Sequence, residues 1–301
     1  MVDHLPEAEP SRPRRGRRPI VTAVLLVVLL AAAAYVLDGL ANSGSTRSGA
    51  VYPPASRAAP GSPGPAATTP ATSGFGNNPA PVLALSGEFP DDGPGTYRYA
   101  KGEGEMLGES GPVHRFRLAV EDGVEQYIAS ERSSEASDAV GFMDEFAGFV
   151  DDTLGAPAGW TAGGDVRFQR VPGNGEYDFT IYLTTTDTTA RLCATVGLDV
   201  VGGGLPDGGV SCRTPGQVVL NLSRWRLSVP AYVAAGVTLE TYRQMLVNHE
   251  VGHQLGYGHE ACPRRGGPAP VMQQQSIALR GCEPNPWPYL DGARYTGPPV
   301  P

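Results

Sequence analysis

The chain has 301 residues, of which 41% are hydrophobic, and this length and composition predict one sizeable folded domain with appended segments. Its formal net charge is −8, and from residue 82 onward 16 Arg and Lys residues stand against 27 Asp and Glu residues. Because phosphate binding requires clustered cations, this acidic balance argues against a nucleic acid as partner.

A basic segment and a long apolar segment come first. Residues 1–19 contain five arginines, and residues 20–37 (IVTAVLLVVLLAAAAYVL) contain Thr22 as their one clearly polar residue. That length suffices to cross a bilayer, and the preceding arginines favour a cytoplasmic N-terminus. We therefore expect a cytoplasmic tail (1–19), a transmembrane signal anchor (20–37) and an extracellular remainder of a cell-membrane protein. The alanines at 31–34 leave a second interpretation open, a cleaved signal peptide and a secreted product.

A low-complexity segment separates the apolar residues from the rest of the chain. Residues 41–81 are rich in Ala, Pro, Ser, Gly and Thr and hold hardly any large apolar side chains. Such a segment cannot bury enough surface to offset the entropy of ordering it. We therefore expect a disordered linker over residues 38–81 and a folded domain over residues 82–301.

The folded domain contains patterns of both strands and helices. Residues 114–124 predict a strand that closes on a turn at Asp122-Gly123. Residues 137–155 place apolar side chains at helical spacing and stop at Gly155, which predicts an amphipathic helix covering a sheet. Three further strands are expected, at residues 166–171, 178–186 and 217–225. Together these elements predict an α+β domain.

The four cysteines all lie in the part of the chain expected to be exported, where disulfides persist. Pairing neighbours gives Cys193–Cys212 and Cys262–Cys282, which we favour among the three possible pairings because each closes a loop of about twenty residues, worth around 3 kcal/mol. A cysteine zinc site lacks any C-x-x-C spacing to support it. The glycine-rich residues 199–209 are then a disulfide-tied loop, since no P-loop lysine accompanies them.

Three of the five histidines fall within residues 248–260, NHEVGHQLGYGHE. Thr238 can cap a helix on which His249 and His253, four residues apart, share one face and can bind one metal ion. Gly256 can end this helix in a left-handed conformation, which lets His259 return as the third ligand. Three imidazoles leave one coordination position open, as in a catalytic Zn²⁺ site.

Glu250 follows the first histidine directly and is not expected to bind the metal. We expect it to act as the general base, which takes a proton from water and passes it to the leaving amine. A purely structural zinc site would have no need of a carboxylate at this position.

The stretch HEVGHQLGYGH resembles the long zinc signature of the metzincin clan of metallopeptidases, in which a methionine-containing turn lies beneath the metal. Met272 in PAPVMQQQS follows His259 at a plausible distance for that turn. The resemblance implies a twisted mixed sheet, a covering helix, an active-site helix, and an edge strand within residues 178–222 that pairs with an extended peptide or protein substrate. The matching residues are His249, Glu250, His253, Gly256, His259 and Met272.

Other features depart from familiar metzincin branches. Glu260 is reminiscent of astacins, but Gln274 stands where their tyrosine ligand would be, and no cysteine precedes Cys193 to form a cysteine switch. The layout instead resembles a largely uncharacterised actinobacterial family of exported metzincin-like domains. The sequence thus predicts an exported, membrane-anchored zinc endopeptidase. A catalytically inactive, zinc-stabilised binding module of the cell envelope and a zinc amidase acting on a non-protein substrate remain as alternatives.

Overall fold

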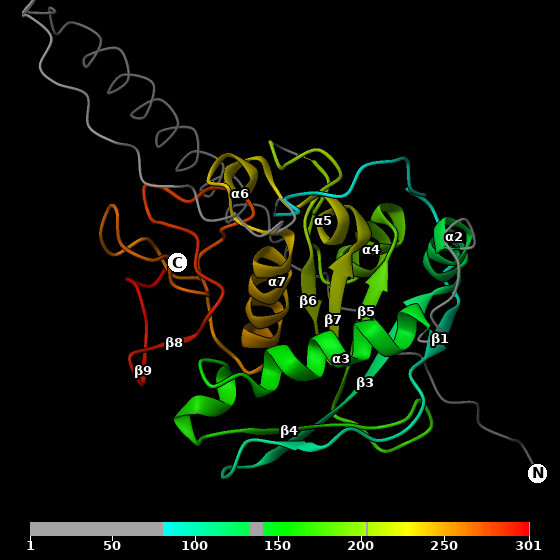
Figure 1. The fold of residues 1–301 in the computed structure, drawn as a ribbon, viewed down its shortest axis with the longest axis horizontal. Coiled ribbons are helices and arrows are strands. Elements are labelled where there is room, and N and C mark those ends of the chain that lie inside the picture. The colour runs from blue at the N-terminus through cyan, green and yellow to red at the C-terminus, as the bar shows by residue number, and fades with distance from the viewer. Residues whose placement is uncertain (1–80, 133–140, 203, 301) are drawn as a thin grey trace, which may run out of the picture. The chain divides into compact units, whose positions relative to one another are not determined.

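The computed structural model describes residues 81–132, 141–202 and 204–300 (Figure 1). The expected anchor at residues 20–37 lies outside the described residues, as does the expected linker except for Pro81. Within the described ranges, no helix combines the length and the apolar character that a bilayer crossing requires.

A seven-stranded sheet forms the centre of the domain. Its order is β2-β4-β3-β5-β7-β6, and β1 pairs with the C-terminal end of β3. The pairs β3–β4, β3–β5 and β5–β7 are parallel, and the remaining pairs are antiparallel, so the sheet is mixed. The strands are β1 (Tyr97–Tyr99), β2 (Met106–Leu107), β3 (Val113–Glu121), β4 (Arg167–Arg170), β5 (Phe179–Thr184), β6 (Cys212–Thr214) and β7 (Gln217–Asn221).

Two long helices, α3 and α7, pack on the same face of the sheet and contact each other (Figure 1). A small hairpin of β8 (Tyr289–Leu290) and β9 (Ala293–Arg294) lies in the segment that follows α7. The helices are α2 (Asp122–Arg132), α3 (Phe142–Gly155), the 3₁₀ helix η1 (Trp160–Gly163), α4 (Thr186–Ala194), α5 (Leu222–Leu227), α6 (Pro230–Ala234) and α7 (Leu239–Gln254). The expected α+β class with a mixed sheet and a covering helix is confirmed.

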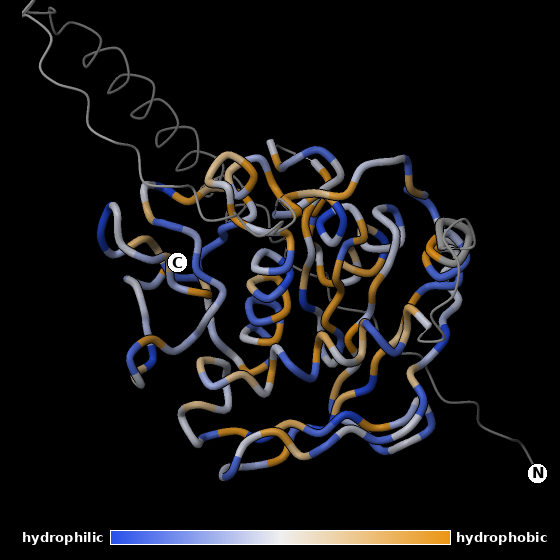
Figure 2. Tube along the Cα trace, in the orientation of Figure 1, coloured by the Kyte–Doolittle hydropathy of each residue, from blue (hydrophilic) through white to orange (hydrophobic). Residues whose placement is uncertain are grey.

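The alternation of side chains along the strands divides the buried residues into two groups. Ile181 on β5 and Leu220 on β7 point into the main core beneath α3 and α7. Val219 points to the other face, where it packs with Cys193 and Cys212. Figure 2 shows the hydrophobic residues gathered on the strands and on the side of α7 that faces them. This burial fixes which face of α7 is left for the polar residues of the histidine motif.

Two boundaries predicted from the sequence are wrong. Asp122-Gly123 opens helix α2 rather than forming a turn, and the Asp122 N–H donates to the carbonyl of Thr96. The strand expected over residues 217–225 ends at Asn221, whose side chain accepts from the Ser223 N–H and caps α5. The helix expected over residues 137–155 is α3, which ends at Gly155 as predicted; residues 137–140 lie outside the described residues.

Both predicted disulfides are confirmed. Cys193–Cys212 joins α4 to β6, and Cys262–Cys282 joins the chain before and after Met272.

Candidate metal centre

Helix α7 carries the first part of the histidine motif through the middle of the domain. The Thr238 side chain accepts from the Thr241 N–H at 3.1 Å, which satisfies one of the free amide groups at the start of the helix. Leu239, Tyr242 and Leu246 then bury one side of α7 in the core. This packing holds His249 and His253, one turn apart, at the wall of a cavity.

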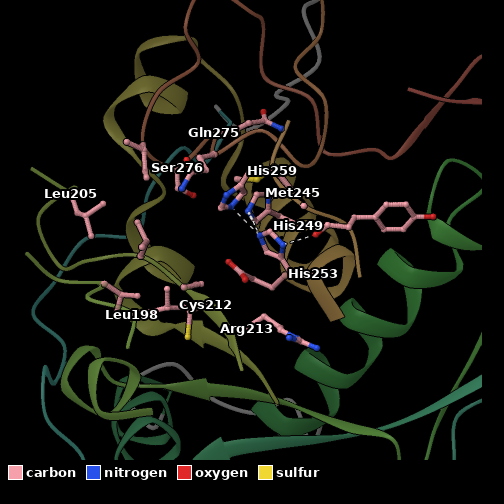
Figure 3. Close-up of a pocket in the computed structure, with 18 of the residues that line it drawn as sticks. Leu198, Leu205, Cys212, Arg213, Met245, His249, His253, His259, Gln275 and Ser276 are labelled. Atoms are coloured by element: carbon pink, nitrogen blue, oxygen red, sulfur yellow. Dashed lines mark hydrogen bonds between the residues drawn. The ribbon is translucent and has the colours of Figure 1, made fainter. Parts of the chain in front are cut away.

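The structure brings the three predicted metal ligands together (Figure 3). Nε2 of His253 lies 3.2 Å from Nε2 of His249 and 3.1 Å from Nε2 of His259. The candidate ligand atoms of the three residues all lie within 4.8 Å of one another. The triad can therefore hold a metal ion.

The hydrogen bonds of the rings fix which nitrogen faces the site. Nδ1 of His249 lies 2.8 Å from the carbonyl oxygen of Val271, and Nδ1 of His253 lies 2.8 Å from that of Tyr257. A carbonyl oxygen only accepts, so each Nδ1 carries the proton and donates it. The Nε2 atoms of both rings are then unprotonated, and their lone pairs point toward the same place. A cation bound there would stabilise this arrangement.

Burial keeps the three rings neutral. Together with the charge of the neighbouring His253, which contributes less, it lowers the pKa of His249 to about 3 and that of His259 to about 4. The pKa of His253 is also lowered, by burial first and then by the charge of Arg213, against a hydrogen bond to Tyr257 that raises it. At neutral pH all three are in the form that binds metal.

The donor set and its spacing fit zinc. Two imidazole nitrogens bound to one tetrahedral Zn²⁺ at 2.0–2.1 Å stand about 3.3 Å apart. The separations of Nε2 of His253 from Nε2 of His249 and of His259, 3.2 and 3.1 Å, are close to this value. Three neutral imidazoles facing an open cavity also match the ligand type and the open position of a catalytic zinc site.

Glu250 presents a buried carboxyl group to the same cavity. Its side chain is 4% exposed, and burial raises its pKa to about 8. Oε2 has no hydrogen-bond partner within the part of the chain that the structure describes. Burying a polar oxygen without a hydrogen-bond partner costs free energy. This atom is therefore placed to form a hydrogen bond with water or with a substrate.

Gly256 and Met272 occupy the positions that complete the motif. Gly256 follows the end of α7 with φ at 97°, a left-handed conformation that glycine adopts without steric cost. The chain then returns to His259, and the Glu260 N–H donates to the carbonyl of Met272. Met272 is fully buried, with its sulfur directly beneath Gly252 of α7.

Two neighbours of the site, Trp160 and Gly252, were not predicted from the sequence. The Trp160 indole N–H donates to the carbonyl of Asn248 at 2.9 Å, and its ring stacks on that of Tyr257 at 4.7 Å. Nothing in the sequence linked η1 to the histidine motif. Gly252, inside the helix, did carry a signal, because a glycine within a helical pattern indicates close approach by another group.

A cavity of about 510 Å³ opens at the three histidines and Glu250. Edge strand β6 contributes Cys212 and Arg213, and the stretch between Cys193 and Cys212 contributes Leu198 and Leu205. The chain after Met272 closes the cavity with four residues, Gln274, Gln275, Ser276 and Ile277. Its volume lies within the range of small-molecule and peptide side-chain sites.

The C-terminal segment, residues 293–300, forms backbone hydrogen bonds to the chain at the third histidine. The Val300 N–H donates to the carbonyl of His259 at 2.9 Å, and the Ala261 N–H to that of Pro298 at 2.7 Å. Arg294 pairs with Glu260 at 3.3 Å. Its guanidinium also lies over the rings of Trp160 and Tyr257.

Fold and site together define an α+β domain with a three-histidine cluster and a buried glutamate in one cavity. Residues 83–290 match the family model DUF3152, described as a protein of unknown function, and the chain belongs to this family. No curated protein and no solved structure matches the chain.

Proposed function

We propose that the protein is a zinc-dependent endopeptidase, exported and anchored in the membrane by residues 20–37. One observation carries the proposal. The Nε2 atoms of His249, His253 and His259 converge at the cavity that Glu250 also lines, and Oε2 of Glu250 is buried without a partner in the described chain. The likeness of this motif to the metzincin signature agrees with it.

The chain's own residues suit the hydrolysis of an amide. The three imidazoles would hold the zinc, which supplies Lewis acidity toward water and a substrate carbonyl. The positive charge of the bound zinc would favour the ionised form of Glu250, which takes the proton of the attacking water and returns it to the leaving nitrogen. The Nδ1–H bonds to Val271 and Tyr257 keep the ring orientations fixed while this proton moves.

Edge strand β6 favours a peptide over other amides. It pairs with β7 along one edge, and in the described chain no strand pairs with its other edge. Cys212 and Arg213 of this strand line the cavity beside the histidines. An extended peptide can add to such an edge through main-chain hydrogen bonds, which place a backbone carbonyl at the site.

Glu250→Gln tests the catalytic role. Full-length wild type and variant, each loaded with zinc, are incubated with a diverse peptide pool, and the products are read by mass spectrometry. We expect the variant to bind zinc as wild type does and to lose about 10²–10⁴-fold in turnover, because positioned general-base catalysis is worth that much.

The outcomes separate the three functions considered for this site. Zinc-dependent cleavage by wild type alone supports the peptidase. Zinc bound in both proteins with no cleavage by either contradicts it. A parallel incubation with cell-wall amides then distinguishes an amidase, which hydrolyses them, from an inactive binding module, which does not.

A further inference from the structure

Arg213 is the one arginine or lysine among the described residues that line the cavity. It lies in the middle of edge strand β6, where its Cα pairs with that of Val218. Cys212 on one side of it and Thr214 on the other are buried, while Arg213 is partly exposed. Alternation along the strand therefore directs this side chain away from the Cys212 disulfide.

A neutral amide holds the guanidinium in place. Nε of Arg213 donates to Oε1 of Gln254, at the end of α7, at 3.1 Å. Among the described residues no carboxylate forms an ion pair with it. Arg170 and Arg294, by contrast, pair with Asp151 and Glu260. Arg213 is thus positioned by a neutral group and has no ion-pair partner among the described residues.

The two sides of the cavity differ in character. In Figure 3, Leu198 and Leu205 lie on one side of the histidines, and Arg213 lies away from them toward His253. An extended peptide lying along β6 would pass Arg213 next to the reacting carbonyl. Among the described residues, the terminal nitrogens of the guanidinium have no hydrogen-bond partner, and they form the fork that matches a carboxylate.

We propose that Arg213 binds a carboxylate of the substrate, so that the protein selects peptides carrying an acidic group beside the cleaved bond. The carboxylate can come from an Asp or Glu side chain or from the free C-terminus of a peptide. This inference rests on the proposed peptidase function. It adds a substrate class that the histidine motif does not specify.

The test measures binding in the Glu250→Gln background, so that it does not depend on turnover. Full-length zinc-loaded protein in mild detergent is titrated with fluorescent heptapeptides, blocked at both ends, that carry Glu, Gln or Lys at each position in turn. A Gln peptide with a free C-terminus separates the two sources of carboxylate. We expect the best carboxylate peptide to bind about tenfold more tightly than its blocked Gln counterpart.

Three further substitutions assign the preference to Arg213. Arg213→Gln removes the charge and should abolish the preference, and Arg213→Glu should transfer it to the Lys peptides. Gln254→Met keeps the charge and removes its anchor, so the preference should weaken. Arg115→Gln is the matched control, because Arg115 is exposed on β3 and does not line the cavity.

A preference that survives in Arg213→Gln overturns the inference, and so does the absence of any preference in the parent, including a failure to bind the peptides. A cleavage assay with wild type separates this result from the proposed function. Cleavage without regard to acidic groups refutes the role of Arg213 alone. Binding that depends on Arg213 without cleavage refutes the peptidase and keeps the carboxylate site.

Discussion

Gly252 lies in α7 between the two histidines that share its face. A Cβ at this position would stand 2.4 Å from the sulfur of Met272 and 2.6 Å from Cζ2 of Trp160. The absence of a side chain therefore lets the methionine turn and the indole pack directly against the helix. Met272 can lie beneath the site because residue 252 is a glycine, which has only a hydrogen atom in place of a side chain.

Gly252→Ala should destabilise the fold by about 1–3 kcal/mol, because Met272 and Trp160 must both move to admit the methyl group. Gly148→Ala is the matched control. Gly148 is exposed in α3 with nothing within 4 Å of an added Cβ, so alanine should stabilise the helix by about 0.5–1 kcal/mol. Chemical unfolding of both variants measures the two effects. The explanation fails if the two substitutions shift stability in the same direction.

At the scale of residues, the sequence predicted what the local spacing determines. His249, His253 and Glu250 follow from the helical repeat, and His259 needs only a turn at Gly256. The supporting contacts of Trp160 depend on how η1, nearly ninety positions earlier, packs on α7. No local pattern encodes such a contact, so the sequence could not predict it.

The C-terminal segment, residues 293–300, is the element that fixes the loop of the third ligand. Arg294 and Glu260 are mostly buried, with side-chain exposures of 17% and 13%, and the Gly297 N–H also donates to Glu260. Glu260 stands directly after His259. Loss of its partner would leave a carboxylate in a poorly solvated position beside the ligand.

Arg294→Met should lower stability by about 2–3 kcal/mol and weaken zinc binding, because Glu260 then lacks its counter-ion. Adding Glu260→Gln to this variant should restore a large part of the loss, since the neutral amide needs no cation. Urea unfolding of the two single variants and the double variant measures the coupling, and competition with a chelator measures zinc affinity. A double variant less stable than Arg294→Met contradicts the pairing.

At the scale of elements, the helices α3 and α7 and the strands β3, β4, β5 and β7 were predicted, whereas the helices α2, α4 and α5 were not. α7 and β5 carry enough apolar repeats to be recognised. α5 was missed because apolar and polar residues go on alternating from Leu220 to Ser223, as in a strand, while the cap that ends the strand is one hydrogen bond from the Ser223 N–H to the Asn221 side chain. The three residues of β6 are too few to show a period, and only the resemblance to metzincins indicated an edge strand in this region.

For the whole molecule, removal of zinc should lower the melting temperature. A ligand present at a thousand times its dissociation constant stabilises the folded state by about 4 kcal/mol, which corresponds to roughly 8–16 °C for a domain of this size. Scanning calorimetry of the full-length protein with zinc and with a chelator measures the difference. The His253→Ala, His259→Ala double variant should melt at the same temperature in both conditions. A chelator effect that persists in this variant places the ion elsewhere.

The N-terminal segment is expected to determine where the protein acts. We expect residues 20–37 to remain attached, because the apolar segment is long enough to span the membrane and the arginines precede it. Fractionation of expressing cells, followed by N-terminal sequencing, checks this. Recovery of the protein from the medium with an N-terminus beyond residue 34 would replace the anchor with a cleaved signal peptide.

The bonds from residues 298–300 to the chain around His259 also have a consequence in time. A growing chain emerges N-terminal end first at about 5–20 residues per second, so His259 exists for a few seconds before its backbone partner at Val300 is made. During that interval the third ligand lacks the contacts that hold its loop. The loop of the third proposed ligand therefore gains its last backbone contacts late in biosynthesis.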